Sequence, residues 1–292
     1  MTASLRLPVA VAFTSALLWG VWWVPVRLLE DVGVDGAWTG VFMIGLALPM
    51  LLILGLFRPT SRRPMTARLA LSGALIGGAM ALYTVAITET TVLRAVLIFY
   101  LSPVWAILIE TIWLGRRFRL GNALAFTLAV VGILTIFRFD TSTAGWNIGD
   151  TFALFSGLSW AAGSALVFTG ADVDARRLSL WGCIGAVGIS AAVILVFNHP
   201  VPAFTIDAAN LGLATGSMYI APVLIATLWS AQRLTPTTLA FLLTGEIISG
   251  VATSALFLSE PFGWPEVIGS VLIVSAALVE VAMPKSDNIT KA

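Results

Sequence analysis

Apolar stretches of about 20 residues, separated by short polar loops, follow one another along the whole chain. A stretch of this length crosses the hydrocarbon core of a bilayer as a helix, because helices and closed barrels alone satisfy the backbone there. Composition agrees, since 59% of the 292 residues are hydrophobic and 11% are charged. The sequence therefore predicts an all-α polytopic membrane protein, a single transmembrane domain over residues 1–292 that contacts the lipid bilayer.

Ten spans are predicted from the lengths of the apolar stretches and the turn residues between them. They lie near residues 9–29, 37–57, 67–87, 92–114, 121–137, 149–170, 179–197, 209–230, 236–257 and 264–283. The first stretch contains Trp19, Trp22 and Trp23 and no small-residue cleavage pattern follows it, so we expect a helix there and not a signal peptide.

Basic residues are sorted between the two sets of alternate loops. Thirteen of the sixteen fall on one set: Arg6, Arg58, Arg62, Arg63, Arg68, Arg116, Arg117, Arg119, Arg176, Arg177, Arg233, Lys285 and Lys291. Arg27, Arg94 and Arg138 fall on the other set, together with most of the carboxylates. Positively charged loops are retained in the cytoplasm during insertion, so both termini are predicted to be cytoplasmic.

Several function classes are disfavoured by the composition. The chain has one cysteine (Cys183) and one histidine (His199), which leaves no internal disulfide and no metal cluster of the usual ligands. We find no nucleophile dyad and no cofactor motif, so we expect neither an enzyme nor a bound cofactor. The net charge of +1 gives no reason to expect nucleic-acid binding.

The two halves of the chain look alike. The turn Leu-Gly-Arg-Arg-Phe at 114–118 recurs as Leu-Ser-Glu-Pro-Phe at 258–262, and this offset of 144 places Ser102 opposite Glu246. Five spans per half is an odd number, so the second copy must enter the membrane from the opposite side. We therefore predict two inverted repeats, 1–144 and 145–292, around a central cavity. Similarity of apolar helices by composition alone is the alternative.

Polar and aromatic side chains gather in the first, third, fourth, sixth, eighth and ninth spans, which we expect to line the cavity. In the sixth span, helical spacing puts Ser156, Ser159, Trp160 and Ser164 on one face. Trp19, which the repeat relates to Trp160, is the second aromatic candidate to flank a site. Filling of the helix core is the alternative for both rings, and we favour it for Trp22, Trp23 and Trp105.

All three tyrosines, Tyr83, Tyr100 and Tyr219, lie inside predicted spans. A phenol facing lipid would leave its hydroxyl without a partner, so these side chains are expected to line a wet path or to bond a neighbouring helix. Tyr100 precedes Pro103, which frees a backbone carbonyl in the preceding turn. Pro25 and Pro222 predict kinks in the first and eighth spans.

Glu246 lies near the middle of the ninth span, where a charged carboxylate is expensive and usually has a functional or pairing role. It is a candidate to bind the amino group of a substrate, to carry a coupling proton, or to serve as a structural hydrogen-bonding group. No lysine or arginine occurs at comparable depth, so the sequence suggests no ion-pair partner.

These features together resemble the drug/metabolite transporter superfamily, EamA type. The resemblance rests on the order of the ten spans, the two related turns, Leu-Leu-Trp-Gly in the first span and Tyr-Leu-Ser-Pro-Val-Trp at 100–105. Within that group the chain looks most like the YddG-type amino-acid exporters. Ser102 stands where some close relatives have a tryptophan. The resemblance therefore supports a preference for aromatic substrates less well than it supports amino-acid export.

The resemblance implies a secondary transporter that exports amino acids, aromatic and other neutral ones, across the bacterial inner membrane by alternating access. Export of other small metabolites or drugs is the alternative, and a channel or membrane assembly partner is the alternative outside transporters. The oligomeric state stays open, a monomer included. The candidate substrate-binding residues are Trp19, Tyr83, Tyr100, Ser102, Trp160, Ser164, Tyr219 and Glu246.

Overall fold

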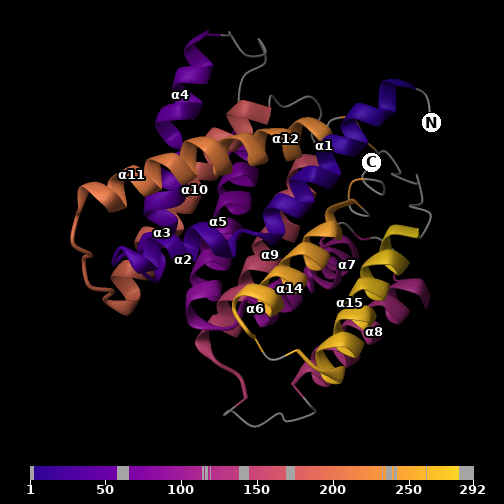
Figure 1. The fold of residues 1–292 in the computed structure, drawn as a ribbon. Helices are drawn as coiled ribbons and strands as arrows, with labels where there is room; N and C mark the ends of the chain where they lie inside the picture. The colour runs from indigo at the N-terminus through magenta and orange to yellow at the C-terminus, as the bar shows by residue number, and fades with distance from the viewer. Residues whose placement is uncertain are drawn as a thin grey trace.

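The structure is a computed structural model, and its described part is a bundle of helices joined by turns (Figure 1). It describes residues 3–57, 66–113, 115, 118, 120–137, 145–168, 175–231, 233–234, 239, 242–260 and 262–282. Most of the first turn motif, 114–118, and the predicted periplasmic Arg138 lie outside the described residues.

The helices of the first half are α1 (Ala3–Gly20), α2 (Trp23–Asp31), α3 (Ala37–Gly40), α4 (Leu48–Phe57), α5 (Ala67–Glu89), α6 (Val92–Phe99), α7 (Ser102–Ile112) and α8 (Leu120–Ile136). Those of the second half are α9 (Ile148–Phe168), α10 (Ala175–Phe197), α11 (Ile206–Thr215), α12 (Ala221–Ala231), α14 (Gly245–Phe257) and α15 (Trp264–Ala282). Two short π-helical segments, Val41–Gly45 and Gly216–Ile220, precede α4 and α12.

The predicted spans fall on these helices. Six helical segments of the described chain are long and apolar enough to cross a membrane, and three more apolar helices are shorter. The prediction of a polytopic all-helical membrane protein is confirmed at this level. The count of ten crossings, the repeat boundary at 144/145 and the side of each terminus stay predictions.

Proline explains why several spans are interrupted. Pro25 has no N–H and its ring would clash with the carbonyl four residues earlier, at Val21, which is where the turn between α1 and α2 lies. Pro103 acts in the same way on Phe99, so α6 ends there and α7 begins after a turn at Tyr100–Leu101. Both turns are closed by tighter bonds between residues three apart, such as Leu101 N to Ile98 O at 3.0 Å.

A proline also follows each of the two π-helical segments. Pro49 and Pro222 each follow a π-helical segment by a few residues, and π-bulges often accommodate such a break in the hydrogen-bond ladder. The kinks predicted at Pro25 and Pro222 therefore coincide with observed interruptions. The ninth span is broken as well, by a turn at Thr244, although Gly245 and not a proline follows it.

Hydrogen bonds from serine hydroxyls join helix α5 to α9. Ser72 Oγ donates to Gly163 O at 2.6 Å, Ser156 Oγ to Ala79 O at 2.7 Å and Ser159 Oγ to Leu75 O at 2.7 Å. The serine stripe of the sixth span was expected to line the cavity, and for Ser156 and Ser159 this expectation is wrong. Their hydroxyls join two helices, because a carbonyl of a neighbouring helix satisfies a hydroxyl as well as water does.

Helices α8 and α15 run side by side at one edge of the bundle (Figure 1). A Cβ atom on Gly132 would lie 2.8 Å from Ile273 Cγ1 and 3.0 Å from Gly269 O. A Cβ atom on Gly269 would lie 2.8 Å from Gly132 O. The two backbones approach this closely only because both positions are glycine, as in other small-residue contacts between membrane helices.

Candidate functional site

Tyr100 and Glu246 are in direct contact at the centre of the bundle. The Tyr100 hydroxyl donates to Glu246 Oε2 at 3.0 Å and contacts Leu243 O at 2.7 Å. Both side chains are buried, with Tyr100 8% and Glu246 9% exposed. Within the described residues Glu246 makes no ion pair. Among the described residues, the carboxyl group is therefore held by a neutral hydroxyl and not by a cationic side chain.

The two contacting residues lie at two helix breaks. Tyr100 occupies the turn between α6 and α7, and Glu246 belongs to the first turn of α14, just after Thr244. Residues 100 and 244 are 144 positions apart in the sequence. Broken helices of this kind expose backbone groups at membrane depth where a cavity or a binding site uses them.

Aromatic rings extend from Tyr100 into a connected aromatic cluster. Tyr100 meets Phe99 edge-on, with ring centroids 5.5 Å apart, and Phe99 also lies 6.2 Å from Trp160 and 5.2 Å from Tyr83. Tyr83 meets Trp22 edge-on at 6.5 Å. Such geometries are the favourable ones for aromatic pairs.

The same cluster continues through Trp22 to Trp19 and Tyr219. Their ring centroids lie 5.1 and 6.3 Å, respectively, from the ring centroid of Trp22. The polar tips of these two rings are bonded: Trp19 Nε1 donates to Thr227 Oγ1 at 2.8 Å, and the Tyr219 hydroxyl donates to Leu18 O. Aromatic residues expected near one site from five different spans thus share one aromatic cluster.

One expectation for this cluster is confirmed and one member was not predicted. Trp22 was expected to fill the core, and it does so at 2% exposure, where its ring also contacts Trp19, Tyr83 and Tyr219. Phe99 was not named, although it joins Tyr83, Tyr100 and Trp160. Its position next to the Tyr-Leu-Ser-Pro motif was a usable signal. Of the rings that the structure describes, those of Trp19 and Trp160 do not contact each other directly. They are connected through Trp22, Tyr83 and Phe99.

Ser102 and Ser164 are less closely tied to the cluster. Ser102 begins α7 two residues after Tyr100, and Ser164 lies one turn after Trp160 on α9. Both are half-buried. In the described part of the chain, no hydrogen bond links either hydroxyl to the cluster. Their inclusion in a binding site stays a prediction.

The first span also reaches the Glu246 region. A Cβ atom on Gly20, at the end of α1, would lie 2.5 Å from Glu246 O and 2.6 Å from Gly250 N. Trp23 Nε1 donates to Thr253 Oγ1 at 3.0 Å, one further turn along α14. The break in the first span and the start of α14 are thus packed backbone against backbone.

One end of the bundle is fastened by charged groups that the sequence analysis did not single out. Arg94 of α6 donates to Asp150 Oδ2 at 2.5 Å, and Asp150 is fully buried. Asp150 Oδ2 also accepts from Asn147 N at 2.9 Å, while Asp150 N donates to Asn147 Oδ1 at 2.9 Å. This reciprocal pair is a capping box, and the spacing Asn147-x-x-Asp150 would have predicted it.

Glu260 of the turn before α15 fastens α6 from the other side. Its Oε1 and Oε2 accept from Val92 N at 2.7 Å and Leu93 N at 3.0 Å. These are free amide groups at the start of α6, where the helix dipole favours a negative charge. The glutamate of the Leu-Ser-Glu-Pro-Phe turn therefore ties the second half of the chain to the first.

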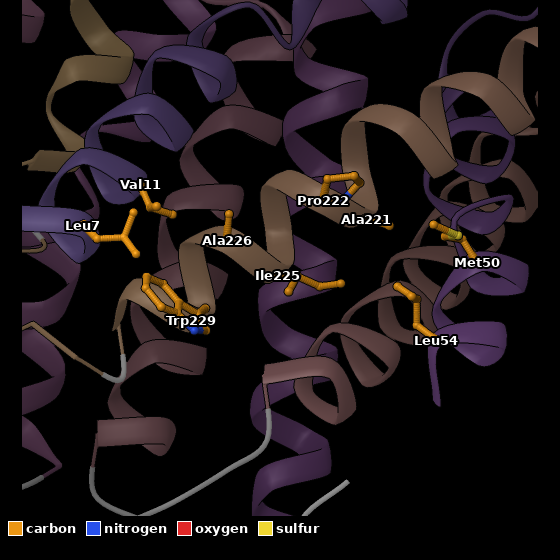
Figure 2. Close-up of a pocket in the computed structure, with 9 residues that line it drawn as sticks. All are labelled: Leu7, Val11, Met50, Leu54, Ala221, Pro222, Ile225, Ala226 and Trp229. Carbon is orange, nitrogen blue, oxygen red and sulfur yellow. The ribbon is translucent and has the colours of Figure 1, made fainter. Parts of the chain in front are cut away.

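At the other end of these helices an apolar groove runs between α1, α4 and α12 (Figure 2). Its volume is about 410 Å³, and Val11, Met50 and Ile225 are among the lining side chains. Figure 2 shows that the lining residues come from both halves of the chain. The groove is distinct from the predicted central site, because none of the eight candidate residues lines it.

The central arrangement combines groups that suit a small amphipathic molecule. Aromatic rings are suitable neighbours for a flat or apolar side chain, and a carboxylate with adjacent aromatic faces attracts an ammonium group. Within the described residues no three His, Cys, Asp or Glu side chains are grouped to hold a metal ion.

Comparisons with known proteins agree with the membrane architecture. Residues 6–138 match the model of the EamA-like transporter family. Protein RarD of Salmonella typhimurium strain LT2 is 27% identical over 293 residues, covering 95% of this chain and 93% of the relative. Protein RarD of Salmonella typhi is similar to the same extent.

A solved crystal structure of a protein 18% identical in sequence superimposes with a TM-score of 0.60, covering 93% of this chain and 95% of the other. This likeness shows that the fold is shared over nearly the whole chain. Residues 6–138 are similar to the EamA-like transporter family, and this similarity supports a multi-pass membrane transporter of small molecules.

Proposed function

We propose that this protein is a secondary transporter that exports amino acids, aromatic and other neutral ones, across the bacterial inner membrane by alternating access. The observation that carries this proposal is the contact between Tyr100 and Glu246 within the aromatic cluster. A buried carboxyl group that makes no ion pair with any described residue, beside aromatic rings, complements an ammonium group attached to an apolar side chain.

In this mechanism the substrate ammonium displaces the Tyr100 hydroxyl from Glu246 and is held by the carboxylate. The rings of Tyr83, Phe99 and Trp160 contact the substrate side chain, and their aromatic faces add cation–π attraction. Release follows when the Tyr100–Glu246 bond forms again. The substrate is carried without chemical change.

Motion in this proposal comes from the two halves, residues 1–144 and 145–292, acting as inverted repeats. The helix breaks at Tyr100 and Thr244, which share the 144-residue offset of the turn motifs, support this assignment. A break in each half gives each repeat a place to bend at the site, as in transporters built from discontinuous helices.

Counterflow of an amino-acid panel in proteoliposomes tests the function. We expect saturable exchange of aromatic and other neutral amino acids. Tyr100→Ala and Trp160→Ala should each lower the exchange at least about tenfold, equivalent to about 1.4 kcal/mol of lost binding. Trp264→Ala is the matched control, because Trp264 lies at a span end and is 78% exposed.

Each alternative has its own outcome in this assay. Exchange of other metabolites or drugs, with no amino acid accepted, would replace the substrate class and keep the carrier. Flux without saturation or counterflow would indicate a channel. The absence of any flux would indicate an assembly partner, and a chemically changed product would indicate an enzyme. Glu246→Gln should abolish any pH dependence of transport if Glu246 carries a coupling proton, and retained pH dependence would assign that proton to another group.

A further inference from the structure

The apolar groove between α1, α4 and α12 has no role in the proposed transport site. Its side chains are apolar throughout the described lining, including Leu7 of α1, Leu54 of α4 and Pro222 of α12 (Figure 2). The volume of about 410 Å³ lies within the range of about 300–1,000 Å³ that is usual for ligand sites. A hydrocarbon chain is the ligand class that such a lining favours.

Three arginines lie beside this groove. The Arg233 guanidinium lies 4.1 Å from the ring centroid of Trp229, which lines the groove, and its Nη1 donates to Trp229 O at 2.9 Å. Arg176 Nη1 donates to Leu54 O at 3.4 Å, at the end of the α4 wall. Arg6 precedes the lining residue Leu7 and is exposed. Arg6 of α1 and Arg233, just after α12, thus place positive charge beside Leu7 and Trp229 at one end of the groove, and Arg176 at the start of α10 lies at the Leu54 end (Figure 2).

These residues all lie at the helix ends that the charge pattern assigns to the cytoplasmic side. Leu7 is near the start of α1, Leu54 is near the end of α4 and Trp229 is near the end of α12. A tryptophan at the membrane–water boundary with arginines beside it is typical of the headgroup region. Anionic lipids of the cytoplasmic leaflet attract arginines placed there.

We infer that the groove between α1, α4 and α12 binds an anionic phospholipid of the inner leaflet. One acyl chain lies along Val11, Met50 and Ile225, and the headgroup phosphate is held at the arginine-bearing mouth by Arg233 and Arg6. The occupant joins α1 and α4 of the first half to α12 of the second half. Charge complementarity selects the lipid, because the walls hold any acyl chain but the mouth favours an anion.

Photocrosslinking of the purified full-length protein tests this inference. The probes are phosphatidylglycerol and phosphatidylcholine with a diazirine in the acyl chain, and labelled peptides are identified by mass spectrometry. We expect phosphatidylglycerol to label the groove segments of α1, α4 and α12 at least fivefold more than phosphatidylcholine does. Equal labelling by the two lipids, or labelling spread evenly over all outer helix faces, would overturn the inference.

Two variants separate the headgroup contact from the chain contact. Arg233→Gln should reduce phosphatidylglycerol labelling of the groove severalfold, whereas the control Arg68→Gln, which removes an exposed arginine from α5, should leave it unchanged. Ala226→Phe narrows the groove and should reduce labelling by both lipids. If Arg233→Gln and Arg68→Gln give the same labelling, the headgroup assignment is wrong, whether or not Ala226→Phe folds.

Discussion

The two ends of the helix bundle hold their arginines in different ways. At the end predicted to be periplasmic, Arg94 pairs with Asp150, and Arg27 Nη1 donates to Glu30 Oε2 at 2.7 Å. At the end predicted to be cytoplasmic, Arg6 and Arg233 are exposed beside an apolar groove, and Arg233 contacts the ring and the carbonyl of Trp229.

The difference assigns separate tasks to the two ends. Ion pairs and helix caps hold α6 against α9 and the turn before α15 at one end. At the other end α1, α4 and α12 leave space between them. In the proposed carrier, we expect these ion pairs and caps to keep the fastened end closed. Variants that break the Arg94–Asp150 pair, the Glu260 cap or the central Tyr100–Glu246 contact test this comparison.

The largest effect is expected from Asp150→Ala. It leaves Arg94 without its carboxylate and removes the capping box of α9, so we expect a loss of about 3 kcal/mol in the free energy of unfolding. Unfolding in detergent, followed by tryptophan fluorescence, measures this. Asp207→Ala is the control, because Asp207 is an exposed carboxylate in the first turn of α11. Equal stability of the two variants would show that the buried pair does not fasten this end.

A smaller effect is expected from Glu260→Ala, which removes both acceptors at the start of α6. Loss of a helix cap costs about 1–2 kcal/mol. Because the cap joins the two halves of the chain, accessibility of the α6 start to hydrogen exchange should also rise. Glu89→Ala removes an exposed carboxylate from the end of α5 and serves as the control. Unchanged exchange at Val92 and Leu93 would contradict the fastening role.

The smallest effect on stability is expected from Tyr100→Phe. It removes one hydroxyl from the contact with Glu246 and should cost about 1 kcal/mol, while all ring contacts are kept. Tyr83→Phe is the matched control, because within the described residues no hydrogen bond of the Tyr83 hydroxyl is seen. If Tyr100→Phe alters amino-acid counterflow and Tyr83→Phe does not, the hydroxyl takes part in transport. The same counterflow in both variants would limit it to packing.

Much of the helical frame was predictable from the sequence. The third span was expected at 67–87 and α5 covers 67–89, and the last span was expected at 264–283 and α15 covers 264–282. These limits follow from apolar length and turn residues, which are local properties. Proline similarly announced the breaks near Pro25 and Pro222, because its effect on the preceding turn is local.

Contacts between distant helices were harder to predict. The sequence singled out Tyr100 and Glu246 separately but did not pair them, since their contact depends on how two broken helices meet. The serine pattern of α9 fits a wet face and a helix–helix contact equally well, and Ser156 and Ser159 make the second. Trp22 was expected to fill the core, but its ring partners could not be predicted, because they come from α1, α5 and the π-helical segment before α12.

The paired glycines of α8 and α15 carry a consequence for any rocking motion. A methyl group at residue 132 would lie 3.0 Å from Gly269 O, and one at residue 269 would lie 2.8 Å from Gly132 O, so this contact keeps its close spacing only while both residues are glycine. One helix comes from each half of the chain. If the halves rock as proposed, we expect them to stay together along α8 and α15 and to move most at the edge furthest from this contact.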